Sequence, residues 1–343
     1  MGNITAIVVI TIAVALIFDV INGFHDSANS IATIVSTRVL SPKFAVLWAA
    51  FFNFVAMFIF APRVADTISK IIIIDANVTA FSYVILAGLI GAVVWDLITW
   101  WLGLPTSSSH ALIGGLTGAG LAYGGFDVIR WEKLGQTVTF IPLAPLMGAV
   151  MGFGFMIIVY WIFRRWSPNK VDKVFRKGQL VSAALYSLGH GGNDAQKTMG
   201  IIMAILLAAG IFSPDVHLSL TNPQTLWIIL SCKTAIALGT AMGGWKIVKT
   251  MGMKLTQLRP VHGFAAETAG AATLFIATHF GIPISTTHTI AGAIVGVGST
   301  TNAAGIKWKI AFNIVVAWVI TIPFAAIVGG LCFYIIKLIH HSF

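Results

Sequence analysis

The sequence predicts an all-α polytopic membrane protein with two inverted-topology repeats. Each repeat has about five crossings, with broken or re-entrant helices around a central site. Three observations predict this fold. Hydrophobic residues make up 57% of the 343 residues and charged residues only 9%, which leaves too little polar surface to cover a soluble globule. Apolar runs of nearly membrane-spanning length recur along the whole chain. One polar turn is written twice, once in each half.

The repeated turn is GLPTSSSH at Gly103–His110 and GIPISTTH at Gly281–His288. The match continues at a constant offset into a glycine-punctuated apolar segment after each copy. A proline followed by three hydroxyl residues is typical of a capped helix start, where side-chain oxygens and unpaired backbone N–H groups gather at the positive end of the helix. Such an end is a natural binding site for an anion.

The hydroxyl residues of both turns are therefore candidate ligands for an anion: Ser107, Ser108, Ser109, Ser285, Thr286 and Thr287. The structural alternative is that they only cap helices and hydrogen-bond within the membrane. Duplication of the whole pattern favours the functional interpretation. We expect His110 and His288 to pack or to bond a neighbouring loop, because no further metal ligands stand at a matching spacing.

The net charge of +10 is spread over short loops between apolar runs, which indicates positive-inside orientation and not nucleic-acid binding. The densest basic cluster divides the chain into a first transmembrane repeat (1–163), a basic cytoplasmic linker (164–178) and a second repeat (179–343). A second basic segment, from Lys246 to Arg259, should also be cytoplasmic. With an odd number of crossings per half, both termini would be extracellular in a multi-pass cell-membrane protein. Ile4–Val20 reads as a retained span.

A polar motif follows this first span. Asp19–Ser30 reads DVINGFHDSANS, which is too polar for a lipid-facing helix and is tolerated at membrane depth only inside protein or beside a wet cavity. A weaker echo, GHGGNDAQKT, stands at Gly189–Thr198. Aligning the two copies places Asp194 on Asp26. In each half of the chain the polar motif precedes the hydroxyl turn.

Five acidic residues lie at membrane depth, where an unrelieved carboxylate costs several kcal/mol: Asp19, Asp26, Asp96, Asp194 and Glu267. Carboxylate and amide oxygens are the ligands that a hard cation prefers. The candidate ligands for sodium, or carriers of a proton, are Asp19, Asn22, Asp26, Asn29, Asp194, Gln196 and Glu267. Asp26, Asn193 and Asp194 are also candidates for contact with the anion. The structural alternative for Asp194 is an ion pair with Lys197, and Asp96 has no counterpart in the repeat and reads as structural.

Asn22–Thr33, Gly189–Gly200 and the two turns together resemble the inorganic phosphate transporter family, over nearly the whole chain. Members of this family carry a duplicated motif around an Asn/His-Asp pair followed by Asn or Gln; the first copy here has His25 where Asn is commonest. The resemblance implies a secondary transporter with inverted repeats, often a homodimer, that moves inorganic phosphate with sodium ions or protons. It implies no cofactor besides that coupling cation.

The residues themselves suggest why transport would be coupled. Asp26 and Asp194 beside the hydroxyl turns would repel a phosphate anion, so a cation must bind first or together with it. This predicts import of inorganic phosphate by symport with sodium or protons. A carboxylate near the substrate also favours phosphate over sulfate, because only phosphate retains a proton to donate to it.

Three other functions stay open at this point. The same fold could be a permease for sulfate or another tetrahedral oxyanion. A passive anion channel would favour basic rings along its pore, which the motifs lack. An intramembrane hydrolase could use Ser108 or Ser109 as nucleophile. However, both halves keep the hydroxyl run although an enzyme needs one nucleophile, and no G-x-S-x-G elbow is present. We therefore expect a transporter and not an enzyme.

Overall fold

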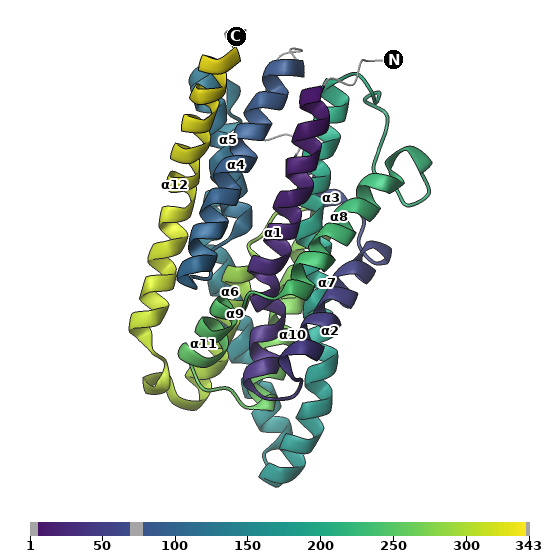
Figure 1. The fold of residues 1–343 in the computed structure, drawn as a ribbon. Helices are drawn as coiled ribbons and strands as arrows, with labels where there is room; N and C mark the ends of the chain where they lie inside the picture. Colours follow the sequence, from purple (N-terminus) through teal and green to yellow (C-terminus); the bar gives the residue numbers. More distant parts are fainter. Residues whose placement is uncertain (1–5, 69–77, 341–343) are drawn as a thin grey trace.

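The computed structural model describes residues 6–68 and 78–340, and every regular element in that part is a helix (Figure 1). The first half contains α1 (Ala6–Ser36), α2 (Pro42–Val55), η1 (Ala56–Phe58), α3 (Arg63–Ile68), α4 (Val78–Leu102), α5 (Ser108–Gly124), η2 (Gly125–Val128) and α6 (Trp131–Phe163). The second half contains α7 (Pro168–Ala208), α8 (Pro223–Met242), α9 (Trp245–Lys249), η3 (Thr250–Lys254), α10 (Pro260–His279), α11 (Thr286–Asn302), η4 (Ala303–Gly305) and α12 (Trp308–His340).

The two halves pack in matching ways. Helix α1 packs on α4 as α7 packs on α10, and α1 packs on α8 of the second half as α7 packs on α2 of the first. The last helix of each half crosses over: α6 lies against α10 and α11, and α12 lies against α4 and α5. Each half is therefore completed by a helix from the other.

Glycines permit the closest of these crossings. A Cβ at Gly118 of α5 would lie 1.9 Å from the carbonyl oxygen of Ala326 in α12, and a Cβ at Gly296 of α11 would lie 2.1 Å from that of Ala149 in α6. Gly118 and Gly296 are matching positions of the sequence repeat. The glycines thus do what small residues do between membrane helices, which is to let two backbones meet.

The start of α1 and the end of α12 lie at the same end of the molecule, opposite the start of α7 (Figure 1). Helices α1 and α7, which carry the matching polar motifs, run in opposite directions in this view. The two basic segments share the α7 end, because Trp166, Asn169 and Lys254 line one cavity there. This arrangement agrees with the expectation that both basic segments lie on one side of the membrane.

Helices continue through both polar motifs and through most of the predicted linker. The polar motifs do not break their helices: α1 runs without interruption through Asp19–Ser30, and α7 runs through the second motif. Neither motif contains proline, and both are buried among other helices, where protein groups can satisfy their polar side chains. The predicted linker is also mostly helical, because Ser167 is extended and Pro168 begins α7, leaving a short connection at 164–167.

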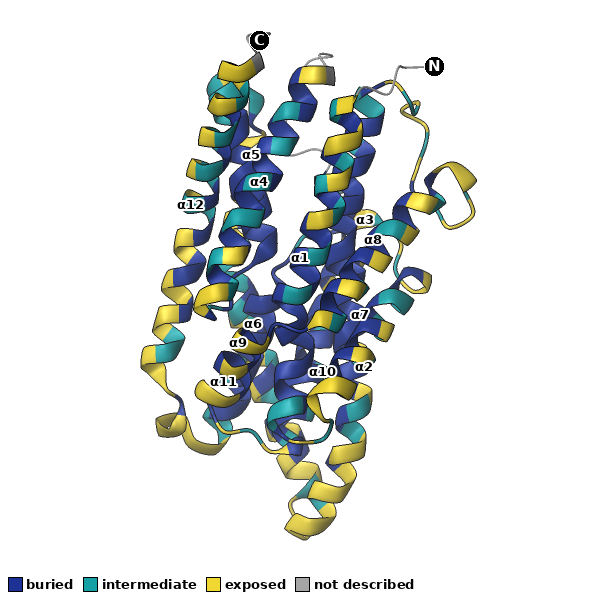
Figure 2. Cartoon of the chain, viewed as in Figure 1, coloured by how far each residue is buried: buried dark blue, intermediate teal, exposed yellow. Residues whose placement is uncertain are grey.

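Within the described residues, five helices are long and apolar enough to cross a membrane: α1, α4, α6, α8 and α12. The other predicted spans are helical but shorter or more polar. Large apolar side chains of α6 and α12 face outward, among them Trp161 and Phe312 at 67% exposure each. Buried residues fill the middle of the molecule, and exposed residues gather at the α6–α7 end (Figure 2).

Candidate functional site

The two repeated turns have the same backbone geometry. Gly103 and Gly281 end their helices with positive φ angles of 70° and 68°, a conformation that glycine adopts without steric cost. The next N–H in each turn, from Leu104 or Ile282, donates 2.9 Å back to a carbonyl of the helix that has just ended. The chain then turns into α5 or α11. The break predicted at each turn is confirmed.

The outer hydroxyls of the turns are helix caps. Ser107 accepts a hydrogen bond from the His110 N–H at 3.3 Å, and Ser285 accepts one from the His288 N–H at 3.2 Å. The structural alternative therefore describes Ser107 and Ser285. Each holds the start of its helix in place and leaves the next two hydroxyls facing the interior.

The two histidines that close the turns pack against each other. The rings of His110 and His288 meet edge to face at 4.7 Å, and His288 also stacks on Trp318 at 3.9 Å. His288 Nδ1 lies 3.3 Å from the carbonyl oxygen of Ile141. The expected packing role is thus confirmed.

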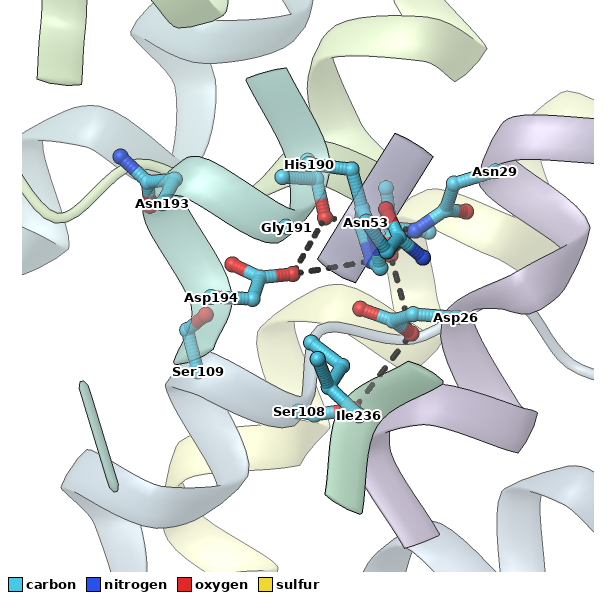
Figure 3. Close-up of polar contacts among 12 residues, drawn as sticks. Asp26, Asn29, Asn53, Ser108, Ser109, His190, Gly191, Asn193, Asp194 and Ile236 are labelled. Carbon is cyan, nitrogen blue, oxygen red and sulfur yellow. Dashed lines mark hydrogen bonds and ion pairs between the residues drawn. The ribbon is translucent and has the colours of Figure 1, made fainter. Parts of the chain in front are cut away.

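Hydroxyl groups from both turns donate hydrogen bonds to Asp26. Its Oδ1 accepts from Ser108 Oγ at 3.4 Å and from Thr287 Oγ1 at 3.5 Å, so one residue of each half reaches the same carboxylate. His25 Nδ1 lies 2.8 Å from the same oxygen. Asp26 and Ser108 are labelled in Figure 3, where a dashed line joins them. The carboxylate is therefore surrounded by donors and buried to 2% exposure.

Asp194 forms the opposite wall. Thr286 Oγ1 donates to its Oδ2 at 3.0 Å, and His190 Nε2 lies 3.2 Å from that oxygen. Lys197, one turn further along α7, forms an ion pair with Oδ1. The Lys197 ammonium also donates to the hydroxyl of Ser109 and to the carbonyl of Ile284, so it touches both turns. The ion pair named as the structural alternative is present, and it lies inside the cluster of predicted ligands.

The groups around Asp26 and those around Asp194 lie next to each other. One ligand atom from each of Asp26, His190 and Asp194 lies within 4.8 Å of the others, and all three residues are buried. Figure 3 shows the two carboxylates turned toward each other from α1 and α7. This spacing could hold a cation between them. We call Asp26, Ser108, Ser109, His190, Asp194, Lys197, Thr286 and Thr287 the central cluster.

Asn29 of α1 bonds two threonines of the central cluster. Its amide donates to Thr287 Oγ1 at 2.8 Å and to Thr286 Oγ1 at 3.3 Å. His190 was not among the predicted residues. The signal was available in the repeat, because the alignment that pairs Asp26 with Asp194 also pairs Asn22 with His190.

Two predicted residues on α7 lie apart from the central cluster and have other partners. Asn193 points away from Asp194 (Figure 3) and donates to Thr278 Oγ1 at 3.1 Å. Gln196 bonds the backbone at residues 61 and 64, which fixes the start of α3. Helical geometry explains both, because neighbours of Asp194 on a continuous α7 point to different sides.

Glu267 also lies outside the central cluster, in a polar group of its own. Its carboxylate accepts from Thr33 and Ser182 at 2.5 Å each and from Gln179 Nε2 at 2.9 Å. Asp19 and Asp96 differ from it. Both are fully buried, and neither of their carboxylate oxygen pairs has a hydrogen-bond partner within the described residues. The same holds for Oδ1 of Asn22.

Comparison with known proteins shows which family the chain resembles. Residues 22–329 match the model of a phosphate transporter family. A probable low-affinity inorganic phosphate transporter of Rhizobium meliloti is 54% identical over 328 residues, which cover 96% of each chain. A protein of the same description from Bacillus subtilis is 43% identical over 331 residues, covering 96% of this chain and 97% of that one.

A solved structure has the same fold. It is described as the sodium-dependent phosphate transporter, and it matches with a TM-score of 0.84 at 25% identity over 98% of this chain and 100% of its own. The family and the relatives are transporters, so enzyme catalysis is not the activity of this protein. The family match covers the first polar motif from Asn22 onward, the whole second motif and both hydroxyl turns, and the chain belongs to the phosphate transporter family.

Proposed function

We propose that this protein is a secondary active transporter that imports inorganic phosphate across the cell membrane by symport with a cation. The observation that carries the proposal is the meeting of the two halves at one carboxylate, where Ser108 and Thr287 both reach Asp26. Sodium is the favoured coupling ion over the proton, since the similar solved structure is described as sodium-dependent.

The charge of the central cluster explains why a cation would be needed. Asp26 and Asp194 contribute two negative charges and Lys197 one positive charge, so the cluster has a net charge of −1 when its histidines are neutral. Two like charges about 4 Å apart repel by about 4 kcal/mol at an effective dielectric constant of about 20. A phosphate anion would meet this repulsion. One sodium ion between Asp26 and Asp194 would remove it, using the oxygen ligands that a hard cation prefers.

The hydroxyls of the central cluster would hold the phosphate. Ser108, Ser109, Thr286 and Thr287 lie at the first turns of α5 and α11, where backbone N–H groups lack intrahelical partners. Hydroxyl and N–H donors from two sides suit a tetrahedral anion. In this proposal Ser107 and Ser285 support the helix starts, and Asn29 orients the two threonines.

We further infer that residues 1–163 and 179–343 form inverted repeats. The antiparallel motif helices and the matching turns support this inference. The basic residues at the α7 end support a cytoplasmic location for that end and an extracellular one for both termini. The outward apolar faces of α6 and α12 would contact lipid, and the homodimer implied by the family stays a prediction.

The proposal is tested by uptake of labelled phosphate into proteoliposomes. Inward sodium and proton gradients are applied separately to the wild type, Asp26→Asn and Asp194→Asn. The matched control is Asp172→Asn, which removes an exposed carboxylate that bonds Arg176 at 3.0 Å. We expect sodium-driven uptake that both cluster variants abolish and that the control retains.

Other outcomes would revise the proposal in defined ways. Uptake driven only by the proton gradient would assign the carboxylates to proton binding. Accumulation of sulfate without phosphate would keep the fold and change the substrate. Phosphate flux that follows its own gradient and ignores both cation gradients would make the protein a channel and overturn the symport.

A further inference from the structure

A large cavity opens at the α7 end of the molecule, away from the central cluster. Its volume is about 960 Å³, at the upper end of the range of small-molecule sites. Its walls come from the ends of α6 and α11, the starts of α7 and α10, the end of η3 with the segment after it, η4 and the residue before α12. Helix α11 connects it to the hydroxyl turn, and its 17 residues place the two sites about 24 Å apart at 1.5 Å per residue.

The charge of this cavity is strongly positive. Lys254, Arg259 and Lys307 line it, and none of the three forms an ion pair with a carboxylate in the part of the chain that the structure describes. The acidic residue in the lining, Asp172, already bonds Arg176 at 3.0 Å. Positive-inside orientation explains basic residues at this end of the protein. It does not explain why three unpaired cations converge on one cavity.

The polar lining adds hydrogen-bond donors. Asn169 and Gln257 contribute amide groups. Three helices also begin at the cavity, since Pro168, Pro260 and Lys307 stand at the starts of α7, α10 and α12. The positive ends of these helices add to the side-chain charges and favour an anion.

One wall of the cavity is held rigid by a chain of hydrogen bonds. His262 Nδ1 accepts from the Arg259 N–H at 3.2 Å, which leaves the imidazole proton on Nε2 to donate to the Tyr160 hydroxyl at 3.2 Å. The Tyr160 hydroxyl then donates to Thr301 Oγ1 at 3.2 Å. Burial, and then Arg259, lower the pKa of His262 to about 4, so His262 adds no positive charge at neutral pH. The chain ties α6, α10 and α11 together.

We propose that this cavity is a second anion site, distinct from the central cluster, that takes a phosphate-bearing anion larger than inorganic phosphate. The volume exceeds the need of a single phosphate, and the three unpaired cations match two or more negative charges. A soluble diphosphate and the headgroup of an anionic lipid share this chemistry. Because α11 reaches both sites, the occupant is placed where it could bias the hydroxyl turn.

The test uses the full-length protein in nanodiscs of zwitterionic lipid, titrated with inorganic pyrophosphate by calorimetry. We expect each of Lys254→Gln, Arg259→Gln and Lys307→Gln to weaken binding about tenfold, since each removes a charge-assisted hydrogen bond. The triple variant should abolish binding. The matched control is Lys173→Gln/Lys177→Gln/Lys249→Gln, which removes three exposed charges that do not line the cavity and should leave binding unchanged. All six positions are exposed, and thermal unfolding checks that the variants fold.

Two further arms separate the occupants and the two sites. In the first arm, phosphatidylglycerol is added to the nanodiscs. If it competes with pyrophosphate in the wild type and does not bind the triple variant, the occupant is a lipid headgroup. Asp194→Asn should bind pyrophosphate as the wild type does, whatever its transport activity. Pyrophosphate binding that is lost in Asp194→Asn and kept in the triple variant would overturn the proposal. An absence of both pyrophosphate and phosphatidylglycerol binding in the wild type would overturn it equally.

Discussion

Asn29 of α1 donates a hydrogen bond to Thr287 of α11 at 2.8 Å, so a motif residue of the first half holds a turn residue of the second. Both side chains are buried to 1% exposure. The Thr287 hydroxyl also reaches Asp26. The amide of Asn29 therefore determines where that hydroxyl points.

Replacing Asn29 with alanine should raise the KM for phosphate about fivefold, because a side-chain hydrogen bond contributes roughly 1 kcal/mol and the Thr287 hydroxyl loses its orientation. Initial uptake rates over a range of phosphate concentrations measure this. Asn222→Ala, which removes a half-buried helix cap of α8 far from the cluster in sequence, is the matched control and should leave the KM unchanged. An unchanged KM with only a lower melting temperature would show that Asn29 is purely structural.

Lys197 should matter for both folding and transport. Lys197→Gln leaves the buried Asp194 carboxylate without its cation, and breaking a buried ion pair costs about 3–5 kcal/mol. The double variant Lys197→Gln/Asp194→Asn should recover most of this stability but no uptake. Thermal unfolding in detergent and uptake in proteoliposomes, on the same preparations, separate the two effects. Recovered uptake in the double variant would make the pair structural.

The cap serine and the inner serine of the turns should respond differently. Ser285→Ala removes a helix cap and should cost about 1 kcal/mol of stability, with uptake per folded molecule kept. Ser108→Ala removes a long bond to Asp26 at 3.4 Å and should change stability little while lowering uptake at least tenfold. Equal effects of both substitutions on uptake would contradict this division of roles.

Asp26 should set the preference between phosphate and sulfate. A carboxylate accepts the remaining proton of phosphate, whereas an amide in its place loses that advantage and fully ionised sulfate has no proton to offer. We expect competition by sulfate in phosphate binding to strengthen in Asp26→Asn relative to the wild type. Binding in detergent avoids the need for transport activity. A phosphate-to-sulfate ratio that stays constant would show that selectivity arises elsewhere.

The helix crossing at Gly118 gives a prediction about packing. Gly118→Ala forces a methyl group onto the carbonyl of Ala326 and should destabilise the protein by about 2 kcal/mol or more, since overpacking moves both backbones. Gly154→Ala is the control, because a Cβ there meets nothing within 4 Å. Melting temperatures of the two variants make the comparison. Equal melting temperatures would mean that α5 and α12 can move apart freely.

Much of this architecture could be predicted because the relevant interactions are local. The proline, the glycine and the capping hydroxyls within each turn determine its conformation. The geometry matches the expectation at Gly103 and Gly281. The conformation of the polar motifs depends on tertiary packing instead. Asp19–Ser30 is too polar for a helix in lipid, yet α1 continues through it because neighbouring helices bury it.

The composition of the central cluster could be predicted only in part. Asp26, Asp194 and the inner hydroxyls follow from the repeat, which pairs matching positions without any knowledge of distance. Side-chain direction does not follow from it. Asn193 is adjacent to Asp194 in the motif, but on a continuous helix it faces Thr278, and His190 one turn earlier faces the cluster instead.

The exchange of α6 and α12 has a consequence for how the molecule can be divided. Each of these helices packs on two helices of the opposite half, so either half alone would present an apolar groove with its covering helix missing. A chain severed between residues 164 and 167 should therefore assemble only when both fragments are made in the same cell. Because the two halves exchange these helices, a tilt of one half must move the outer helix of the other half with it.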